Sequence, residues 1–320
     1  MNFRIALAVL ALLALAAPVR AQTYPSGPVR LIVPTSPGGV TDTMARIVAQ
    51  RLTDQIGQTV IVDNRPGGNG SVGSVAVSHS PPDGLTLLVT SDATITANPH
   101  LSSKLPYTAK DFTPIVVLCR GTPMLVVNSS VPARSVSELI ALAKSKPGSL
   151  NYGSYGVGTY AHLSMEDFKL KTGTDIVHIP YRGATPAAQA LLAGDVSMLL
   201  LNLSSIEAHE STGKVRILAS ASDRRAAARP DLPTVAEAGV PGFSTSVWFA
   251  LFGPPNMPPE LAARINADVG KVLDLPEIKK FFKENSFERV TDSPAEFAKL
   301  VEHDSQKWET LIKQVGARLD

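Results

Sequence analysis

The stretch VRLIVPTSPGGVTD, residues 29–42, runs from a short apolar segment into a glycine-rich turn. An amphipathic pattern follows over Thr43–Ile56, with Met44, Val48 and Leu52 on one helical face. A buried strand, a polar turn and then a helix form the repeating unit of parallel α/β sheets. The stretch therefore predicts an α/β fold.

The same unit recurs along the chain. Leu85–Val89 is a continuous apolar run, which is typical of a strand buried on both faces. Further strands are expected at Ile115–Leu118, Met124–Val127, Val196–Leu203 and Val215–Ser220. Helices are expected between them, one of them opened by a capping box at Ser135. Alternating strands and helices predict doubly wound, mostly parallel sheets flanked by helices.

The last part of the chain suggests how the domains are organised. After Trp248–Phe252 we expect only helices, starting at Pro259 and Ser293. Helices without a strand of their own must cover an existing domain. We therefore expect a first domain at residues 22–123, a second at 124–247, and a return to the first at 248–320. Two crossings of this kind would make a hinge with a cleft between two lobes.

Residues 1–21 have a positive start, a short apolar run and a small-residue end, which indicates a secretory signal peptide and export. Without them Lys+Arg falls from 30 to 28, equal to the 28 Asp+Glu, so the net charge is zero. This argues against nucleic acid and membrane surfaces as partners. The single Cys119 and scattered histidines predict no metal and no cofactor. A monomer is expected.

The turn of the opening stretch is the strongest candidate binding site. It comprises Pro37, Gly38, Gly39, Val40, Thr41 and Asp42. Glycines let a backbone approach a ligand closely, and a helix start offers free N–H groups to an anion. The turn lacks the Lys-Ser/Thr of a phosphate-binding loop. The alternative is an ordinary tight turn capped by Thr41 or Asp42.

Two further loops strengthen the binding interpretation. Gly156–Thr159 and Tyr181–Ala184 also lie between an expected strand and an expected helix, both in the second domain. Loops of this kind gather at the carboxyl ends of the strands, where ligands of open α/β sheets bind. One loop from each lobe would hold an anion from both sides.

Two enzyme interpretations are weaker. Residues 68–73 match G-x-G-x-x-G, with Asp92 19 residues further on, but the following helix is short and we expect this loop to be structural. An exported hydrolase using Ser154 with His162 is a rival, although the chain has no G-x-S-x-G elbow. For His162 a structural hydrogen bond is the commoner role.

Several motifs match a known family. They are PGG at 37–39, DNRPG at 63–67, PDGLTLL at 82–88, DFTPI at 111–115, PYRG at 180–183, LPT at 232–234 and the Trp248 segment. The chain resembles the Bug-type (TctC-like) solute-binding proteins of tripartite tricarboxylate transporters. The resemblance covers nearly all of Tyr24–Asp320.

The resemblance implies a two-lobed periplasmic binding protein of type II, a Venus flytrap. It implies a non-enzyme that captures a small carboxylate and delivers it to membrane permease subunits. A sensor that hands its signal to a membrane kinase is the alternative. In the family the ligand carboxylate is held largely by backbone amides and waters. Here they would come from the 37–42 turn and from Tyr181, Arg182, Gly183 and Ala184.

The resemblance also implies wall positions at Ser91, Asp92, Ala93, Thr94, Ser154, Thr159, Tyr160, His162 and Asn202. Relatives often carry an aspartate just before this asparagine, where this chain has Leu201. If that aspartate holds an ammonium group, an amino-acid ligand is disfavoured here. We therefore expect a non-amino carboxylate, and we expect the backbone of Arg182 to matter more than its guanidinium.

Overall fold

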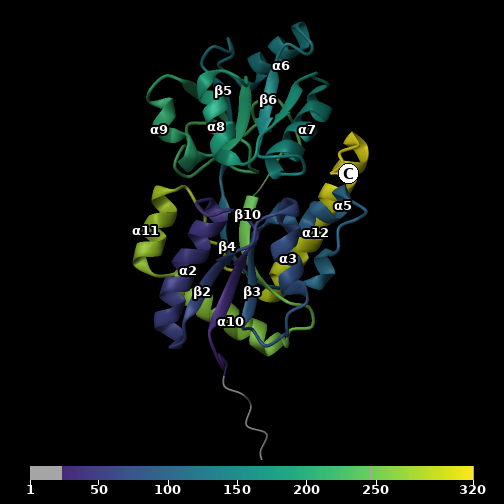
Figure 1. Cartoon of the computed structure of the whole chain (residues 1–320). Coiled ribbons are helices and arrows are strands. Elements are labelled where there is room, and N and C mark those ends of the chain that lie inside the picture. Colours follow the sequence, from purple (N-terminus) through teal and green to yellow (C-terminus); the bar gives the residue numbers. More distant parts are fainter. Residues whose placement is uncertain (1–23, 246, 320) are drawn as a thin grey trace, which may run out of the picture.

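The computed structural model describes residues 24–245 and 247–319, and its strands form two separate sheets, one in each lobe (Figure 1). The signal peptide expected at residues 1–21 falls outside the described residues. Within them, no helix is both long and apolar enough to span a membrane.

The sheet of the first lobe has the order β2-β1-β3-β10-β4. Its strands are β1 (Val29–Val33), β2 (Val60–Asn64), β3 (Thr86–Ser91), β4 (Thr113–Gly121) and β10 (Val247–Gly253). β10 runs antiparallel to both of its neighbours, while β1 runs parallel to β2 and β3. All strands but β10 therefore point the same way, as the mostly parallel prediction requires.

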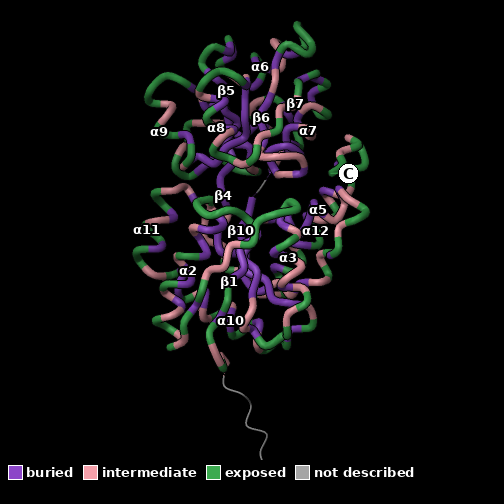
Figure 2. Tube along the Cα trace, in the orientation of Figure 1, coloured by how far each residue is buried: buried purple, intermediate pink, exposed green. Residues whose placement is uncertain are grey.

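Helices cover both faces of this sheet, and its strands are largely buried beneath them (Figure 2). On one face lie α2 (Val40–Ile56), α10 (Pro259–Leu273) and α11 (Pro276–Glu284). On the other lie α3 (Ser71–Ser78), α4 (Asp92–Thr96) and α12 (Pro294–Val315), and α5 (Asn98–Leu101) packs against α4 and α12. Short 3₁₀ turns complete the lobe at Gly68–Gly70 and Ala109–Asp111.

The sheet of the second lobe has the order β7-β6-β8-β5-β9. Its strands are β5 (Pro123–Asn128), β6 (Asn151–Ser154), β7 (Val177–Pro180), β8 (Met198–Asn202) and β9 (Val215–Ser220). Its helices are α6 (Val136–Ser145), α7 (Tyr160–Thr172), α8 (Ala184–Ala193) and α9 (Glu207–Glu210), with a 3₁₀ turn at Leu203–Ser205. β5 is the antiparallel strand here, in the place that β10 takes in the first sheet.

Two crossovers join the lobes. In the first crossover, β4 ends at Gly121 and β5 begins at Pro123. The second crossover, from the second lobe back to the first, passes through Thr245, whose N–H donates to the carbonyl of Ala221 at 2.8 Å. Pro123 pairs with Asn202, which is the carboxyl end of β8. The carboxyl ends of the parallel strands of both sheets therefore lie on either side of the crossovers and face each other.

Most helix starts follow the sequence signals. Ser135 accepts from the N–H of Glu138, and Ser293 with Glu296 forms a complete capping box. α10 begins at Pro259. The prediction of only two helices after β10 is wrong, since α11 lies between them. The segment has only nine residues, but Ile278, Phe281 and Phe282 keep the i, i+3, i+4 spacing of a helix, so the sequence did carry the signal.

An apolar cluster also links the lobes beside the crossovers. Leu163 of α7 packs with Leu101 of α5 and with Trp308, Leu311 and Ile312 of α12. The hydroxyl of Ser164 donates to Thr245 Oγ1 at 2.6 Å. The C-terminal helix of the first lobe thus contacts the second lobe directly.

Candidate functional site

The structure places every predicted site residue after the carboxyl end of a parallel strand or at that end itself. The predicted segments are Pro37–Asp42 after β1, Ser91–Thr94 at β3, Ser154–His162 at β6, Tyr181–Ala184 after β7, and Asn202 of β8. All five therefore lie along the two facing edges. That they bind a ligand stays a prediction.

The turn after β1 is exposed from Thr35 to Gly39 and is held by one carboxylate. Asp42, the third residue of α2, accepts from the N–H of Gly38 at 3.0 Å, from Arg46 Nε at 3.0 Å and from Asn64 Nδ2 at 2.9 Å. Burial alone would raise the pKa of Asp42, but these hydrogen bonds outweigh it and hold the pKa below its usual value. Asp42 is thus the cap that the tight-turn alternative proposed.

The loop after β6 is held by an equivalent bond from a different side chain. His162, the third residue of α7, accepts from the N–H of Gly158 through Nδ1 at 3.1 Å. Its ring stacks on that of His178 with centroids 4.2 Å apart. Burial lowers the pKa of both rings, that of His178 to about 4. Both imidazoles are therefore neutral near pH 7, as Nδ1 must be in order to accept.

The geometry contradicts the hydrolase pairing of Ser154 with His162. Ser154 Oγ instead lies 2.7 Å from His178 Nε2 and 3.1 Å from the carbonyl oxygen of Gly156. Ser154 is fully buried, so its hydroxyl is not presented to a substrate. The Ser154–His178 pair supports the loop that carries Gly156 and Gly158.

Two polar side chains at the facing edges lack partners within the described residues. Asp92 is buried, and neither of its carboxyl oxygens accepts a hydrogen bond. Burial, and after it the charge of Asp304, raises the pKa of Asp92 well above its usual value, which favours the neutral acid. Asn202 Oδ1 is also buried without a partner.

The lobes touch at the loop after β6. A Cβ added to Gly158, whose φ is +82°, would lie 2.4 Å from Leu101 Cδ1 and 3.7 Å from Asn69 Nδ2. Asn69 is fixed by its side-chain bond to Asn98 at 2.8 Å. The 68–73 loop, expected to be only structural, therefore also reaches the other lobe.

The sequence did not point to Asn69, Leu101 or His178 as part of this region. The only available signal for His178 was its place two residues before the Pro180–Gly183 motif. Arg182 and Ala184 are exposed, whereas Tyr181 and Gly183 are half-buried. Cys119 is buried, and burial raises its pKa, so it stays a thiol. Among the described residues no group of His, Cys, Asp and Glu could hold a metal ion.

Two α/β lobes, joined by two crossovers and carrying glycine loops on their facing edges, define a periplasmic binding protein rather than an enzyme. The structure of R. palustris Rpa4515 with adipate superposes with a TM-score of 0.84 at 35% identity, covering 92% of this chain and 100% of that one. MatC from Rhodopseudomonas palustris with bound malate gives 0.80 at 30% identity, covering 90% and 100%.

Sequence comparison gives the family. Protein BugT of Bordetella pertussis is 35% identical over 307 residues, covering 95% of this chain and 94% of that relative. The model of the tripartite tricarboxylate transporter family receptor, TctC, matches residues 44–317. The chain belongs to this family of periplasmic solute-binding proteins, as its motifs indicated.

Proposed function

We propose that the chain is an exported receptor that captures a small non-amino carboxylate between its lobes and delivers it to the permease subunits of a tripartite tricarboxylate-type transporter. The N-terminal 21 residues would be its signal peptide. The observation that carries this proposal is the position of the 37–42 and 181–184 loops on facing edges of different lobes. The relatives named with adipate and malate supply the ligand class.

Backbone amides are suitable anion ligands in this arrangement. α2 and α8 each begin directly after a glycine, Gly39 and Gly183. The first N–H groups of a helix have no partner within it and carry partial positive charge. A carboxylate between two such helix starts is stabilised by amides of both lobes. The ligand favours the closed form, because only in that form do both lobes contact it.

The acidic side chains of the predicted loops argue against an ammonium group on the ligand. Asp42 already accepts bonds from Gly38, Arg46 and Asn64. Burial raises the pKa of Asp92 and so favours its neutral form. Leu201, where the family resemblance implies an aspartate, is buried and apolar. A cationic group would therefore find Asp42 already engaged, Leu201 without charge, and only the buried Asp92, whose neutral form is favoured, without partners among the described residues.

The test is calorimetric titration of refolded, ligand-free protein with adipate, malate, glutamate and aspartate. We expect saturable binding of at least one of the two non-amino acids and weaker binding of the amino acids. Tight glutamate or aspartate binding would contradict the ligand class. Turnover of esters or amides would contradict the receptor itself.

Two substitutions test the amides separately in the two lobes. Proline is well tolerated at the first helical position, so Val40→Pro and Ala184→Pro each remove one N–H while keeping the helix. Loss of a hydrogen bond to a charged group costs about 1.5–3 kcal/mol, or about 10–150-fold in affinity. Val136→Pro, at the start of α6, is the matched control. Unchanged affinity in both test variants would rule out capture by these amides.

Two further measurements address the side chain and the partner. Arg182→Ala should bind almost normally, and a loss above about 100-fold, or 2.7 kcal/mol, would assign the role to the guanidinium. A membrane pull-down with ligand-loaded protein should recover permease subunits. Recovery of a sensor kinase instead would favour the signalling alternative.

A further inference from the structure

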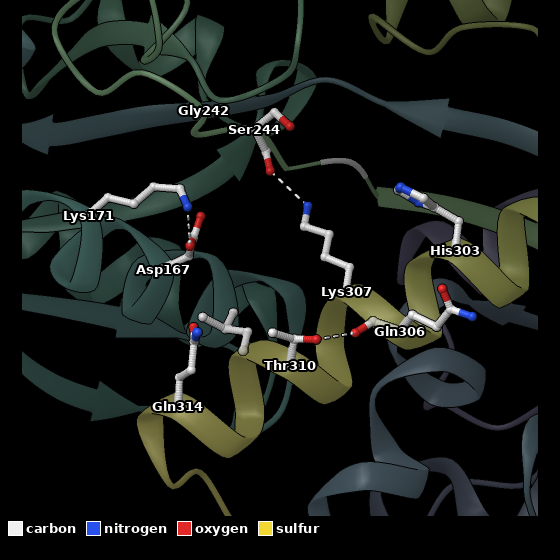
Figure 3. A pocket seen from close by; sticks show the side chains of 10 residues that line it. Asp167, Lys171, Gly242, Ser244, His303, Gln306, Lys307, Thr310 and Gln314 are labelled. Carbon is white, nitrogen blue, oxygen red and sulfur yellow. Dashed lines mark hydrogen bonds and ion pairs between the residues drawn. The ribbon is translucent and has the colours of Figure 1, made fainter.

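A separate polar cavity lies where the chain crosses between the lobes. It has a volume of about 190 Å³ and shares no residue with the predicted loops. Gly121 and Thr122 of the first crossover line it, as do Ser244 and Thr245 of the second. A larger cavity of about 430 Å³ adjoins it and shares Ser244, His303 and Lys307 (Figure 3).

Two carboxylates of the smaller cavity have partners, whereas two of its cations form no salt bridge within the described part of the chain. Glu288 is paired with Arg224, and Asp304 accepts from Trp248 Nε1 at 2.8 Å. Asp223 is the remaining carboxylate of the lining and is exposed. Two cations, Arg120 and Lys307, also line the cavity and form no salt bridge with any described residue.

Arg120 is the lining residue that most clearly lacks a hydrogen-bond acceptor. Its backbone is fixed, because its N–H donates to the carbonyl of Glu288 at 2.9 Å and its carbonyl accepts from Glu288 N at 2.8 Å. Its Nε is buried and has no hydrogen-bond partner among the described residues. Leaving a buried donor unpaired is costly, so a small rotation of the Arg120 side chain that brought its guanidinium to an acceptor in the cavity would be stabilising.

Other donors converge on the same cavity. Lys307 Nζ uses one of its hydrogens on the carbonyl of Ser244 at 2.9 Å and keeps two (Figure 3). Thr245 Oγ1 accepts from Ser164, so its own hydrogen is available. A planar guanidinium matches an oxyanion with two parallel N–H···O bonds.

We propose that this hinge cavity is a second binding site that takes a small inorganic oxyanion of the sulfate or phosphate type. Arg120 and Lys307 supply the charge, and Thr245 supplies a hydroxyl donor. The ion contacts segments on both crossovers and so stiffens the junction of the lobes. The site goes beyond the proposed receptor function and does not depend on the ligand of the facing edges.

The experiment titrates the full protein with sulfate and with phosphate by calorimetry, and repeats both titrations in Arg120→Gln and Lys307→Gln. We expect saturable binding of at least one ion in the wild type and at least tenfold weaker binding in each variant. Arg30→Gln and Lys299→Gln are matched controls, because both residues are exposed and outside the cavity. Circular dichroism identifies any variant that fails to fold, and the other variant then decides.

A second readout locates the ion. Hydrogen exchange at the amides of Thr122 and Thr245 should slow with the bound ion in the wild type and not in Arg120→Gln. The proposal is overturned by an absence of saturable binding, by wild-type affinity in both cavity variants, or by the same response to chloride at equal ionic strength. Loss of ion binding in Val40→Pro or Ala184→Pro, with Arg120→Gln unaffected, would assign the ion to the predicted carboxylate site instead.

Discussion

The loops after β1 and after β6 occupy equivalent places in the two sheets and are built with the same bond but different chemistry. In each, the third residue of the helix accepts the N–H of a glycine four residues earlier, Gly38 for Asp42 and Gly158 for His162. The first acceptor is a carboxylate in an exposed turn. The second is a neutral imidazole in a half-buried loop whose Gly158 is buried and touches the other lobe.

The difference separates two ways of holding a glycine loop near an anion. A carboxylate at a helix start is favoured by the helix dipole but adds negative charge, which Arg46 partly offsets. An imidazole fixes the same N–H without adding charge. The loop of the second lobe thus presents a less negative surface to an anion, at the cost of dependence on neutral histidines.

The largest expected effect comes from replacing the two glycines by alanine. Both have φ near +90°, +92° at Gly38 and +82° at Gly158, so either alanine costs about 1–2 kcal/mol in backbone strain. Only at Gly158 does the new Cβ also meet Leu101, which adds about 1–3 kcal/mol. Urea unfolding should show Gly158→Ala as the more destabilised variant. Equal losses would mean that the contact between the lobes is not tight.

Removing the two caps should show the same asymmetry on a smaller scale. His162→Ala leaves the buried N–H of Gly158 without an acceptor and should lower the free energy of unfolding by about 2–3 kcal/mol. Asp42→Ala exposes the Gly38 N–H to water and should cost about 1 kcal/mol. Chemical denaturation of both variants measures the difference, and a larger loss for Asp42→Ala would reverse our interpretation.

The pH dependence should come from the loop of the second lobe. The pKa of His178 falls from its usual 6.5 to about 4 on folding, so the unfolded chain binds the proton more readily. The contribution of neutral His178 to the free energy of unfolding is fully present above about pH 6.5 and is lost as the pH falls toward about 4. Because water reaches part of the ring, we expect about 1–2 kcal/mol.

The matched variant is His178→Gln, which keeps a donor for Ser154 but does not titrate. Subtracting the unfolding free energy of the variant from that of the wild type removes the contributions of other titrating groups. This difference should shrink as the pH falls from 6.5 to 4. Asp42, whose pKa is lowered, contributes only to losses below its usual 3.8. A constant difference across this range would show that His178 does not titrate there.

The smallest effect is expected at Arg46. Its side chain is 54% exposed, and its ion pair with Asp42 spans one helical turn. Arg46→Gln should cost at most about 0.5 kcal/mol, and less in high salt. Thermal unfolding at low and high salt is a sufficient measurement. A loss above about 1 kcal/mol would mean that the Asp42 cap depends on its countercharge.

Local patterns predicted most of the framework because they report on local physics. Apolar runs marked the strands, and β9 has the bounds expected, Val215–Ser220. Glycine turns marked the loops after β1, β6 and β7. The capping boxes at Ser135 and Ser293 are local hydrogen-bond patterns, so they were also readable from the sequence.

Contacts between distant segments were not predictable in this way. His178 meets Ser154 only because β7 pairs with β6, and a single sequence does not give that register. Leu101 meets Gly158 only because two lobes come together. The sequence could therefore place the candidate loops but could not show which side chains from other segments hold them in position.

The position of β10 imposes an order on folding. All five strands of the second sheet lie within Pro123–Ser220, so that lobe has its complete set before β10 is made. While the chain emerges, the first sheet stays incomplete until β10 is made, because β10 lies between β3 and β4 and, among the described residues, is the only strand with which β4 pairs. A chain emerging N-terminus first can thus complete its second lobe before its first, and a truncation before Val247 would leave β4 unpaired.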